Sequence, residues 1–306
     1  MTNAQRGAMK DQRRIAGVEL GGTKAIATLW QDGRIIADHR VATQTPDATF
    51  DALLPAMQQW WQDARFDAVG IASFGPITLN PAAGDYGAIR TTPKPDWSGA
   101  QILPRLATVF DCPIGLDTDV NAAALAEFRW GAGQGASSLI YLTIGTGVGG
   151  GALVNGVPIH GRLHPEMGHI LLRRQSGDDF VGACPFHGDC VEGLLSGPAL
   201  KARFGAAAED VAADDGRWDA PIGDFAQLLA TLIHSFAPDR ILVGGGVGMG
   251  TGDMLRRARL ALPAILGGYY PDLDQASIDA MITQPQLGDQ AGPLGAIALG
   301  LAAIGE

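Results

Sequence analysis

The chain opens with two runs of strand-forming residues that a glycine turn separates. Residues 15–20 and 25–30 are mostly apolar and carry several β-branched or aromatic side chains, which favours strands. Gly21 and Gly22 lie between the runs, and Asp32-Gly33 follows the second run. An Asp-Gly pair beside an apolar strand is among the strongest hairpin signals. This segment therefore predicts a glycine-bent hairpin that turns back again at residue 33.

A second copy of this pattern begins near the middle of the chain. Residues 139–144 and 151–154 are strand-like runs around Gly145-Thr146-Gly147, and Asn155-Gly156 ends the copy. In both copies the threonine of the glycine turn, Thr23 or Thr146, lies nine residues before the Asp or Asn of the final turn. Two ordinary hairpins could share this spacing by coincidence. The alternative is a duplicated architecture in which one hairpin opens each half and a cleft separates the halves.

Helix-like and strand-like segments alternate through the rest of the chain. Helix patterns cover residues 51–64, 121–130, 224–236, 253–266 and 294–304, and strand patterns cover residues 68–74, 114–116 and 240–243. Between them, residues 75–99 are rich in Gly, Pro and Thr and predict a loop. This alternation predicts an α/β fold.

Composition and charge exclude several classes of protein. The 306 residues are 46% hydrophobic, which suffices for a large core, and the net charge of −10 comes without any basic block. A nucleic-acid partner is therefore disfavoured. Three cysteines do not make a secreted disulfide scaffold, and no apolar run is long enough to span a membrane. Residues 1–14 lack the apolar core of a signal peptide and predict a flexible extension on a cytoplasmic protein.

Three glycine-rich turns are candidate phosphate sites, because backbone N–H groups in such turns attract anions. Gly145, Gly147 and Gly150 match a dinucleotide fingerprint, but that motif needs a helix to follow, and here a strand pattern follows. A Walker-type phosphate loop is also missing from the sequence. The third turn, residues 244–247, follows a strand and precedes a helix, which suits the adenosine side of a nucleotide. Each turn by itself could also be an ordinary tight turn.

A cluster of soft ligands indicates a metal site. Cys184, His187 and Cys190 are spaced as C-x2-H-x2-C, and His169 lies fifteen residues upstream. Two thiolates with two imidazoles favour tetrahedral zinc, in a structural site because no position is left open. The alternative is a pair of buried cysteines with surface histidines. Cys112 is expected in the core.

Acidic residues near the predicted turns are candidates for chemistry. Asp117 and Asp119 stand where a strand pattern meets a helix pattern, where an Asp is commonly only an N-cap. The other interpretation is that one of them is a base for a hydroxyl group. Glu166 lies near the metal cluster and could hold hydroxyls. Glu19 could reach magnesium directly or through water, or could simply be an acid at a strand end.

Several of these motifs occur in an order that resembles the ROK family (repressor, open reading frame, kinase). They are Gly21-Gly-Thr-Lys24, Asp119-x-Asn121, Thr143-Ile-Gly-Thr-Gly147, His164-Pro-Glu-Met-Gly-His169, the cluster from Cys184 to Cys190, and Val243-Gly-Gly-Gly-Val247. The resemblance runs from about residue 15 to the C-terminus, and the zinc cluster is its most specific part.

Other segments are similar to the bacterial fructokinase branch of that family. These are Ser73-Phe-Gly-Pro-Ile77, the stretch from Tyr86 to Pro93, and Glu19, at a place where the glucokinases usually carry Asp. Thr118 stands where the family's glucokinases usually carry Asn, which puts glucose preference in doubt.

The resemblance implies an actin-like ATPase (ribonuclease H-like) duplicated fold with an interdomain cleft. The expected domains are residues 15–118 together with a C-terminal helix at 294–306, and residues 119–293 with a zinc-binding loop. The implied activity is ATP-dependent phosphorylation of D-fructose to fructose 6-phosphate by a homodimer that uses Mg²⁺ with ATP. The alternatives are a glucokinase, a mannokinase, an amino-sugar kinase or a non-catalytic sugar sensor. A transcriptional regulator of the family is disfavoured, because 14 residues before Ile15 are too few for a helix-turn-helix.

The resemblance also assigns site residues. Asp119 is the implied base, Glu19 the magnesium contact, and His169, Cys184, His187 and Cys190 the zinc ligands. The implied ATP and phosphate contacts are Gly21, Gly22, Thr23, Lys24, Thr143, Gly145, Thr146, Gly147, Pro198, Gly244, Gly245, Gly246 and Val247. The implied sugar contacts are Gly75, Thr118, Asn121, Glu166, His169 and Glu192.

Overall fold

The computed structural model describes residues 13–250 and 253–306, and these form two compact units. Unit 1 contains the chain up to Ala126, the segment His160–His164 and the end of the chain from Asp289. Unit 2 contains Glu127–Ile159 and Pro165–Gly288. The expected flexible extension lies outside the described residues except for its last two. The prediction is wrong for Arg14, which is the first residue of a strand.

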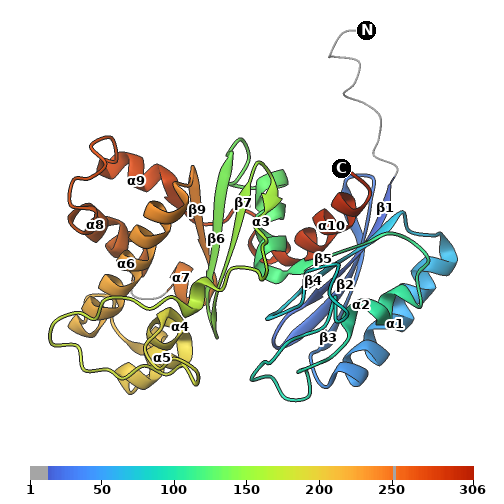
Figure 1. Cartoon of the computed structure of the whole chain (residues 1–306), viewed down its shortest axis with the longest axis horizontal. Helices are drawn as coiled ribbons and strands as arrows, with labels where there is room; N and C mark the ends of the chain where they lie inside the picture. The colour runs from blue at the N-terminus through green and yellow to red at the C-terminus, as the bar shows by residue number, and fades with distance from the viewer. Residues whose placement is uncertain (1–12, 251–252) are drawn as a thin grey trace, which may run out of the picture. The chain divides into compact units, whose positions relative to one another are not determined.

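Unit 1 is built on a five-stranded mixed sheet (Figure 1). Its strands are β1 (Arg14–Leu20), β2 (Lys24–Gln31), β3 (Arg34–Ala42), β4 (Ala68–Ser73) and β5 (Ile114–Thr118), in the order β3-β2-β1-β4-β5. The pairs β1–β2 and β2–β3 are antiparallel, whereas β4 runs parallel to both β1 and β5. Asp32 and Gly33 both have positive φ, 52° and 79°, which makes the predicted tight turn between β2 and β3.

Helices cover both faces of this sheet, as Figure 1 shows. On one face α1 (Pro46–Asp63) and α2 (Ile102–Ala107) contribute Phe50, Leu53 and Ile102 to a buried core. On the other face α10 (Ala291–Ala303) lies directly on the strands. A Cβ atom on Gly70 of β4 would come within 1.8 Å of the Ala296 carbonyl oxygen. Glycine in the strand therefore permits this close approach of the helix.

Unit 2 repeats the topology of unit 1. Its strands are β6 (Ser138–Ile144), β7 (Val148–Val154), β8 (Val157–Pro158), β9 (Arg240–Gly244) and β10 (Ile282–Thr283), in the order β10-β9-β6-β7-β8. Here β7 is antiparallel to β6 and to β8, whereas β9 is parallel to β6 and to β10. Strand for strand, this is the order and direction of β1 to β5. The duplicated α/β architecture predicted from the two hairpins is therefore confirmed.

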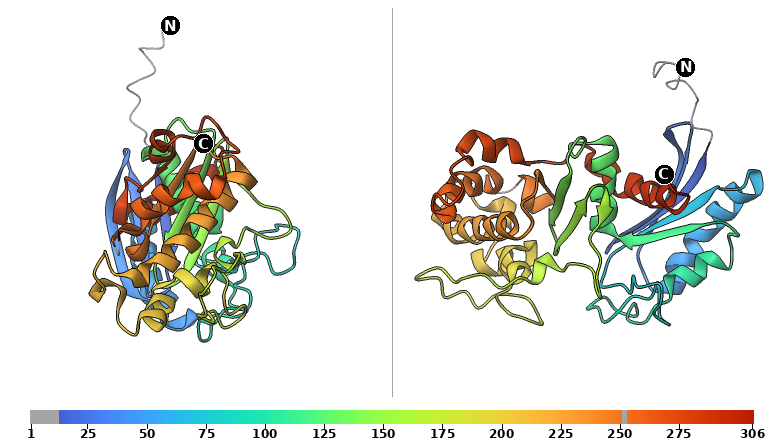
Figure 2. Two further views of the ribbon diagram at one scale, coloured as in Figure 1. Left: turned by 90° about the vertical axis from the view of Figure 1, so that its left-hand side faces the viewer. Right: turned by 45° about the horizontal axis from the view of Figure 1, so that its top comes forward.

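Unit 2 has its own core. Its helices are α4 (Val191–Leu195), α5 (Gly197–Phe204), α6 (Asp219–Phe236), α7 (Gly246–Gly250), α8 (Met254–Leu266) and α9 (Gln275–Met281). Figure 2 shows α6 and α8 side by side, and they pack against each other in the core. One helix, α3 (Asp119–Trp130), begins in unit 1 and ends in unit 2.

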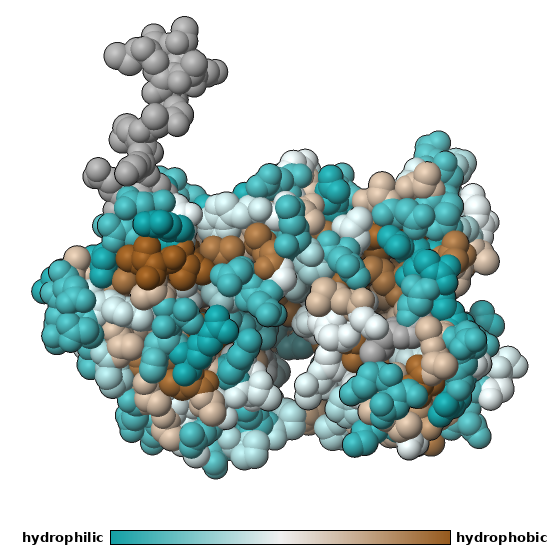
Figure 3. Space-filling model, turned by 180° about the vertical axis from the view of Figure 1, so that it is seen from behind, coloured by the Kyte–Doolittle hydropathy of each residue, from teal (hydrophilic) through white to brown (hydrophobic). Residues whose placement is uncertain are grey.

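Several predicted boundaries shift in the structure. The helix expected to begin at residue 51 begins at Pro46, where Thr45 is the N-cap and accepts a hydrogen bond from the Ala48 N–H at 3.3 Å. The helix expected from residue 224 begins at Asp219. Polar residues cover much of the face drawn in Figure 3, with apolar residues in smaller patches between them. Among the described residues, no helix combines the length and the apolar character needed to cross a membrane.

Candidate active site

The first glycine turn joins β1 to β2 and is open to solvent. The Gly21 N–H donates to the Lys24 carbonyl at 3.0 Å, and Gly22, Thr23 and Lys24 are exposed. The Thr43 hydroxyl braces the turn by donating to the Gly21 carbonyl at 2.8 Å. The turn thus presents backbone N–H groups, a hydroxyl and an ammonium group to solvent, which are the groups that bind phosphate.

Lys94 adds a cation to the first turn that sequence reasoning missed. Its ammonium group donates a short hydrogen bond to the Gly22 carbonyl, although the two residues lie 72 positions apart. Lys94 belongs to the segment that we expected to be a loop, and no local pattern distinguishes it from other surface lysines.

The second and third glycine turns meet in unit 2. Gly245 follows β9 with a φ of 82°, and a Cβ atom there would lie 2.3 Å from the Ile144 carbonyl oxygen. The Gly197 N–H, at the start of α5, donates to the Gly145 carbonyl at 2.7 Å. Gly145 and Gly245 thus lie beside the helix start that carries Pro198, so the structure gathers much of the predicted ATP set of unit 2 in one place. Thr143 is the partner of Gly244 across the β6–β9 pair.

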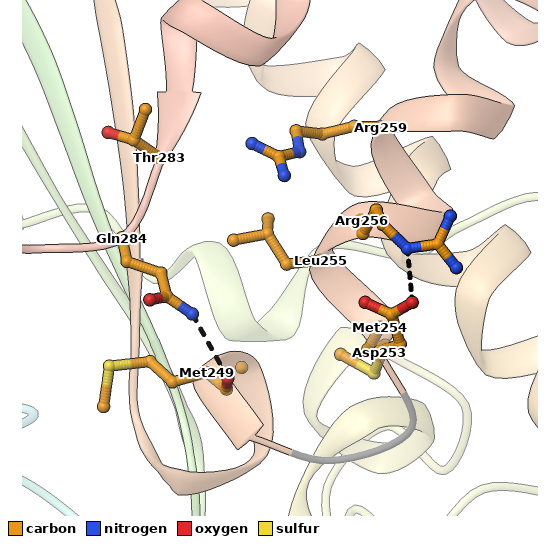
Figure 4. Close-up of a pocket in the computed structure, with 9 residues that line it drawn as sticks. Met249, Asp253, Met254, Leu255, Arg256, Arg259, Thr283 and Gln284 are labelled. Atoms are coloured by element: carbon orange, nitrogen blue, oxygen red, sulfur yellow. Dashed lines mark hydrogen bonds and ion pairs between the residues drawn. The ribbon is translucent and has the colours of Figure 1, made fainter. Parts of the chain in front are cut away.

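A pocket of about 350 Å³ lies next to the third turn, shown in Figure 4. Met249, Met254 and Leu255 give it apolar walls, and the side chains of Arg256 and Arg259 also line it. Its volume is at the lower end of the range for small-molecule sites. The first residue that lines the pocket is Gly248, directly after Val247. The pocket therefore adjoins the turn that is expected to hold the adenosine side of a nucleotide.

The junction of β5 and α3 carries the candidate base. Thr118 supplies the helix cap, because its hydroxyl oxygen accepts from the Asn121 N–H at 3.2 Å. Asp119 is half-buried, and its Oδ1 accepts from the N–H of the next residue, Val120, at 2.9 Å. The interpretation of Asp119 as the N-cap is therefore not supported, since the neighbouring threonine has that role.

Both carboxylate oxygens of Asp117, two residues earlier, have polar partners. It is 2% exposed, and its Oδ1 accepts from the Thr118 N–H at 2.7 Å and from the Asn121 side-chain amide at 2.8 Å. Its Oδ2 pairs with Nε2 of His160 at 2.9 Å. Sequence reasoning did not assign a role to His160, because it lies 43 residues from Asp117 and only the fold brings the two together.

A second histidine of the same segment contacts the loop after β4. His164 is buried, and its Nε2 accepts from the Ile77 N–H at 3.2 Å. A Cβ atom on Gly75 would lie 3.3 Å from the His164 ring. The predicted sugar contact Gly75 therefore lies against the segment His160–His164, within unit 1.

An acidic pair lies beside the second glycine turn in unit 2. The Glu192 carboxylate accepts from the Val148 N–H at 3.1 Å, and a Cβ atom on Gly147 would lie 2.8 Å from it. Although part of Glu166 is exposed, burial and then the negative charge of Glu192 raise the pKa of Glu166 to about 7. Two carboxylates near one exposed turn provide acceptors for hydroxyl groups.

The predicted zinc ligands come together in unit 2. One ligand atom from each of His169, Cys184, His187 and Cys190 lies within 4.8 Å of the others. The Cys–His distances are 3.9 Å from Cys184 to His169, 3.8 Å from Cys184 to His187 and 3.5 Å from Cys190 to His169. A tetrahedral zinc with ordinary bond lengths puts sulfur and nitrogen about 3.6 Å apart, so the residues fit that ion.

The electrostatics of the cluster also call for a cation. Burial is the main cause that raises the pKa of the Cys190 thiol to about 11; the Gly193 N–H lowers this pKa, and the neighbouring Cys184 raises it. Two adjacent thiolates in a buried place require a positive partner, and Zn²⁺ supplies that charge. In both Cys–His contacts of His169 the ring faces sulfur through Nδ1, so its Nε2 points away from the two cysteines.

Glu19 has the character expected of a magnesium contact. Its Oε2 is buried without a hydrogen-bond partner among the described residues, and burial raises its pKa against the opposing charges of Lys24 and Arg40. A buried carboxylate oxygen with no donor suits a hydrated divalent cation. Asp289 contributes a second negative charge nearby.

The chain is similar to known proteins in both sequence and structure. Residues 15–303 match the profile of the ROK family. The fructokinase of Zymomonas mobilis is 41% identical over 304 residues, covering 96% of this chain and 99% of that protein. A putative fructokinase of Bacillus subtilis is 40% identical, with coverage of 93% and 94%. The crystal structure of a ROK hexokinase from Thermus thermophilus, 26% identical, superposes with a TM-score of 0.76 over 95% of this chain and 99% of that one.

Proposed function

Because the chain belongs to the ROK family, we propose that it is an ATP-dependent fructokinase that converts D-fructose to fructose 6-phosphate. The observation that carries this proposal is the near-full-length similarity to proteins named as a fructokinase and a putative fructokinase, at 41% and 40% sequence identity. The candidate base at the start of α3 and the glycine turns supply the chemistry that such a transfer needs. A glucokinase, a mannokinase, an amino-sugar kinase and a non-catalytic sensor are the alternatives.

Asp119 is the proposed base. The hydroxyl oxygen of the sugar forms a bond to the γ-phosphorus of ATP while the bond from that phosphorus to the β–γ bridging oxygen breaks. The hydroxyl proton passes to the Asp119 carboxylate, and ADP leaves. Phosphoryl transfer depends mainly on alignment and charge neutralisation, so an ordinary carboxylate can serve as the base.

The glycine turns are the proposed phosphate contacts. Gly21, Gly22, Thr23 and Lys24 supply donors from the first turn, and Gly145, Thr146 and Gly147 supply them from the second. Gly244, Gly245, Gly246, Val247 and Pro198 are the proposed contacts of the nucleoside side, together with Thr143. Magnesium, when bound with ATP, neutralises phosphate charge, and Glu19 is its proposed protein contact.

The sugar contacts are proposed for residues with suitable acceptors. Glu166 and Glu192 offer carboxylates, and His169 offers Nε2 while its Nδ1 faces the two cysteines. Gly75 leaves room beside His164, and Asn121 has a buried amide. Thr118 is buried and its oxygen already caps α3, so any sugar contact must come from its hydroxyl hydrogen. Zinc, when bound by His169, Cys184, His187 and Cys190, would order the segment between these four ligands, which Glu166 and Glu192 flank in the chain.

The test is ATP-dependent ADP release with magnesium across fructose, mannose, glucose and N-acetylmannosamine. Fructose is expected to give the highest kcat/KM. A higher value for another sugar would keep the kinase and reject the fructose assignment. No release with any of the four, from protein that binds ATP, would favour the sensor. We also propose a cytoplasmic homodimer, which light scattering on the purified protein will test.

A further inference from the structure

The segment His160–His164 is part of unit 1 although the chain on both sides of it belongs to unit 2. It contacts unit 1 through two histidines, with His164 at the loop after β4 and His160 at the start of α3. The contact of His160 is the more unusual, because its partner Asp117 has an almost fully buried carboxylate. Neither residue has a role in the reaction described above.

Asp117 connects His160 to Asn121. Its Oδ2 lies 2.9 Å from Nε2 of His160, and its Oδ1 accepts the Asn121 amide at 2.8 Å. Nε2 of His160 also lies 3.3 Å from the Asn121 amide nitrogen, but one ring nitrogen cannot both donate to Asp117 and accept from Asn121. With His160 donating to the carboxylate, the Asn121 amide is left with Asp117 as its acceptor.

These contacts fix which way the Asn121 amide faces. If the amide were flipped, its oxygen would take the place of the nitrogen 2.8 Å from a carboxylate oxygen, which is repulsive. The Asn121 carbonyl oxygen, Oδ1, is therefore held away from Asp117. It is buried, on a residue that is 1% exposed, and has no hydrogen-bond partner among the described residues. A buried acceptor without a donor is costly, so such an atom points to a ligand that donates.

We propose that His160 is a positioning residue for the sugar: through Asp117 it holds the Asn121 amide so that its carbonyl oxygen accepts a hydrogen bond from a sugar hydroxyl. This inference rests on the proposed sugar kinase activity. Asn121 lies two residues from Asp119 in the first turn of α3, so the same contact also aligns the sugar with the base. The acceptor selects a ligand that carries a hydroxyl donor at this place.

Two other features support the arrangement. The hydrogen bond to Asp117 raises the pKa of His160 despite the partial burial of the ring, which keeps a proton on the donating nitrogen. Tyr86 also lies near Asp117, and burial followed by the Asp117 charge raises the pKa of its phenol, so it stays neutral.

Two variants at the same position test the contact. In His160→Gln the side-chain amide can reach the Asp117 carboxylate, whereas in His160→Asn the amide is one methylene shorter and cannot. We expect His160→Asn to raise the KM for fructose at least tenfold with the KM for ATP changed less than twofold. His160→Gln should keep the KM for fructose within threefold of the parent. His39→Gln is the matched control, because His39 lies on β3 and bonds only to the Ala52 carbonyl among the contacts described for it.

Equal KM values for fructose in His160→Asn and the parent would overturn the proposal. So would a loss shared equally by kcat and both KM values, since that indicates general damage. A second measurement separates this failure from failure of the proposed function. The NMR titration of His160 in the parent should give a pKa above the ordinary histidine value, and Asp117→Asn should lower it. If the parent shows no activity with fructose, the fructose assignment fails, and a His160 titration that fructose leaves unchanged rejects the positioning role as well.

Discussion

The glycine turns that open the two sheets sit at equivalent places in the same topology but are held differently. In unit 1 the turn after β1 is exposed, and a Cβ atom on Gly22 would have no neighbour within 4 Å. In unit 2 the turn after β6 is contacted by the Gly197 N–H and lies beside Glu192. The turn of unit 2 is thus held by the start of α5 and by the Glu192 side chain, whereas the turn of unit 1 is more exposed to solvent.

The two units also differ in the functional features that they contain. Unit 2 carries the Cys/His cluster that is proposed to bind zinc, together with two glycine turns that pack near each other. Unit 1 carries the candidate base and the hydrogen-bonded set of Asp117, Asn121 and His160. Changes at the Cys/His cluster or at the glycine turns of unit 2 should therefore damage stability and nucleotide binding, and changes at the start of α3 should damage transfer and sugar binding with the fold intact.

Removing the zinc ligands should have the largest effect, because the binding free energy of a structural zinc is on the order of 10 kcal/mol. We expect Cys184→Ser with Cys190→Ser to lose the bound zinc and to lower the melting temperature strongly. Metal analysis of the purified protein and a thermal melt provide the measurement. Cys112→Ser is the control, since Cys112 is half-buried in unit 1 and outside the cluster. Retention of one zinc per chain by the double variant would reject the ligand set.

Removing the base should stop transfer without harming the fold. Asp119→Asn keeps an oxygen that can accept from the Val120 N–H, and Thr118 still caps α3. We expect kcat to fall about 10²- to 10⁴-fold, as is usual for loss of a general base. Steady-state kinetics with fructose is the measurement, and zinc content and ATP binding should match the parent. Turnover within tenfold of the parent would exclude Asp119 as the base.

A pair of alanine variants compares the packed third turn, which follows β9, with the open turn after β1. Gly245→Ala puts a Cβ atom 2.3 Å from the Ile144 carbonyl oxygen at a φ of 82°, which should destabilise the protein by roughly 1–3 kcal/mol and raise the KM for ATP. Gly22→Ala meets nothing within 4 Å and should leave the melting temperature nearly unchanged. Denaturant unfolding and ATP kinetics provide the measurements. Equal stability losses in the two variants would remove the contrast between a packed and an open turn.

The smallest effect should come from the ionisation of Glu166. Its pKa is raised to about 7, so the native state binds this proton more tightly than the unfolded chain does. The contribution to stability is therefore present below the unfolded pKa and is lost as the pH rises towards 7. Because the residue is partly exposed, the change should be smaller than the shift alone implies. Melting temperatures of the parent and Glu166→Gln, compared from pH 4.5 to 7.5, should differ in slope over this window. Parallel curves would show that the shift does not exist.

Much of the fold was accessible from local patterns. The hairpins were predicted from Asp-Gly and Asn-Gly pairs, whose backbone preferences need only neighbouring residues. The cysteine and histidine spacing predicted a cluster that the structure assembles. The start of α1 was missed, because an apolar period alone does not reveal that Thr45 and Pro46 begin the helix earlier. Short helices such as α7 and α9 were also missed, since their few residues carry too little periodicity.

The sequence by itself determined the duplicated hairpins, the clustering of two cysteines with two histidines, and the family, because each depends on residues close together in the chain or on their order along it. Only the tertiary structure decided that His160 meets Asp117, that Gly197 meets Gly145 and that α10 lies on Gly70. These contacts join residues more than forty positions apart. Hydrogen bonds and close packing depend on distance and direction in space, and sequence spacing carries neither for residues that distant.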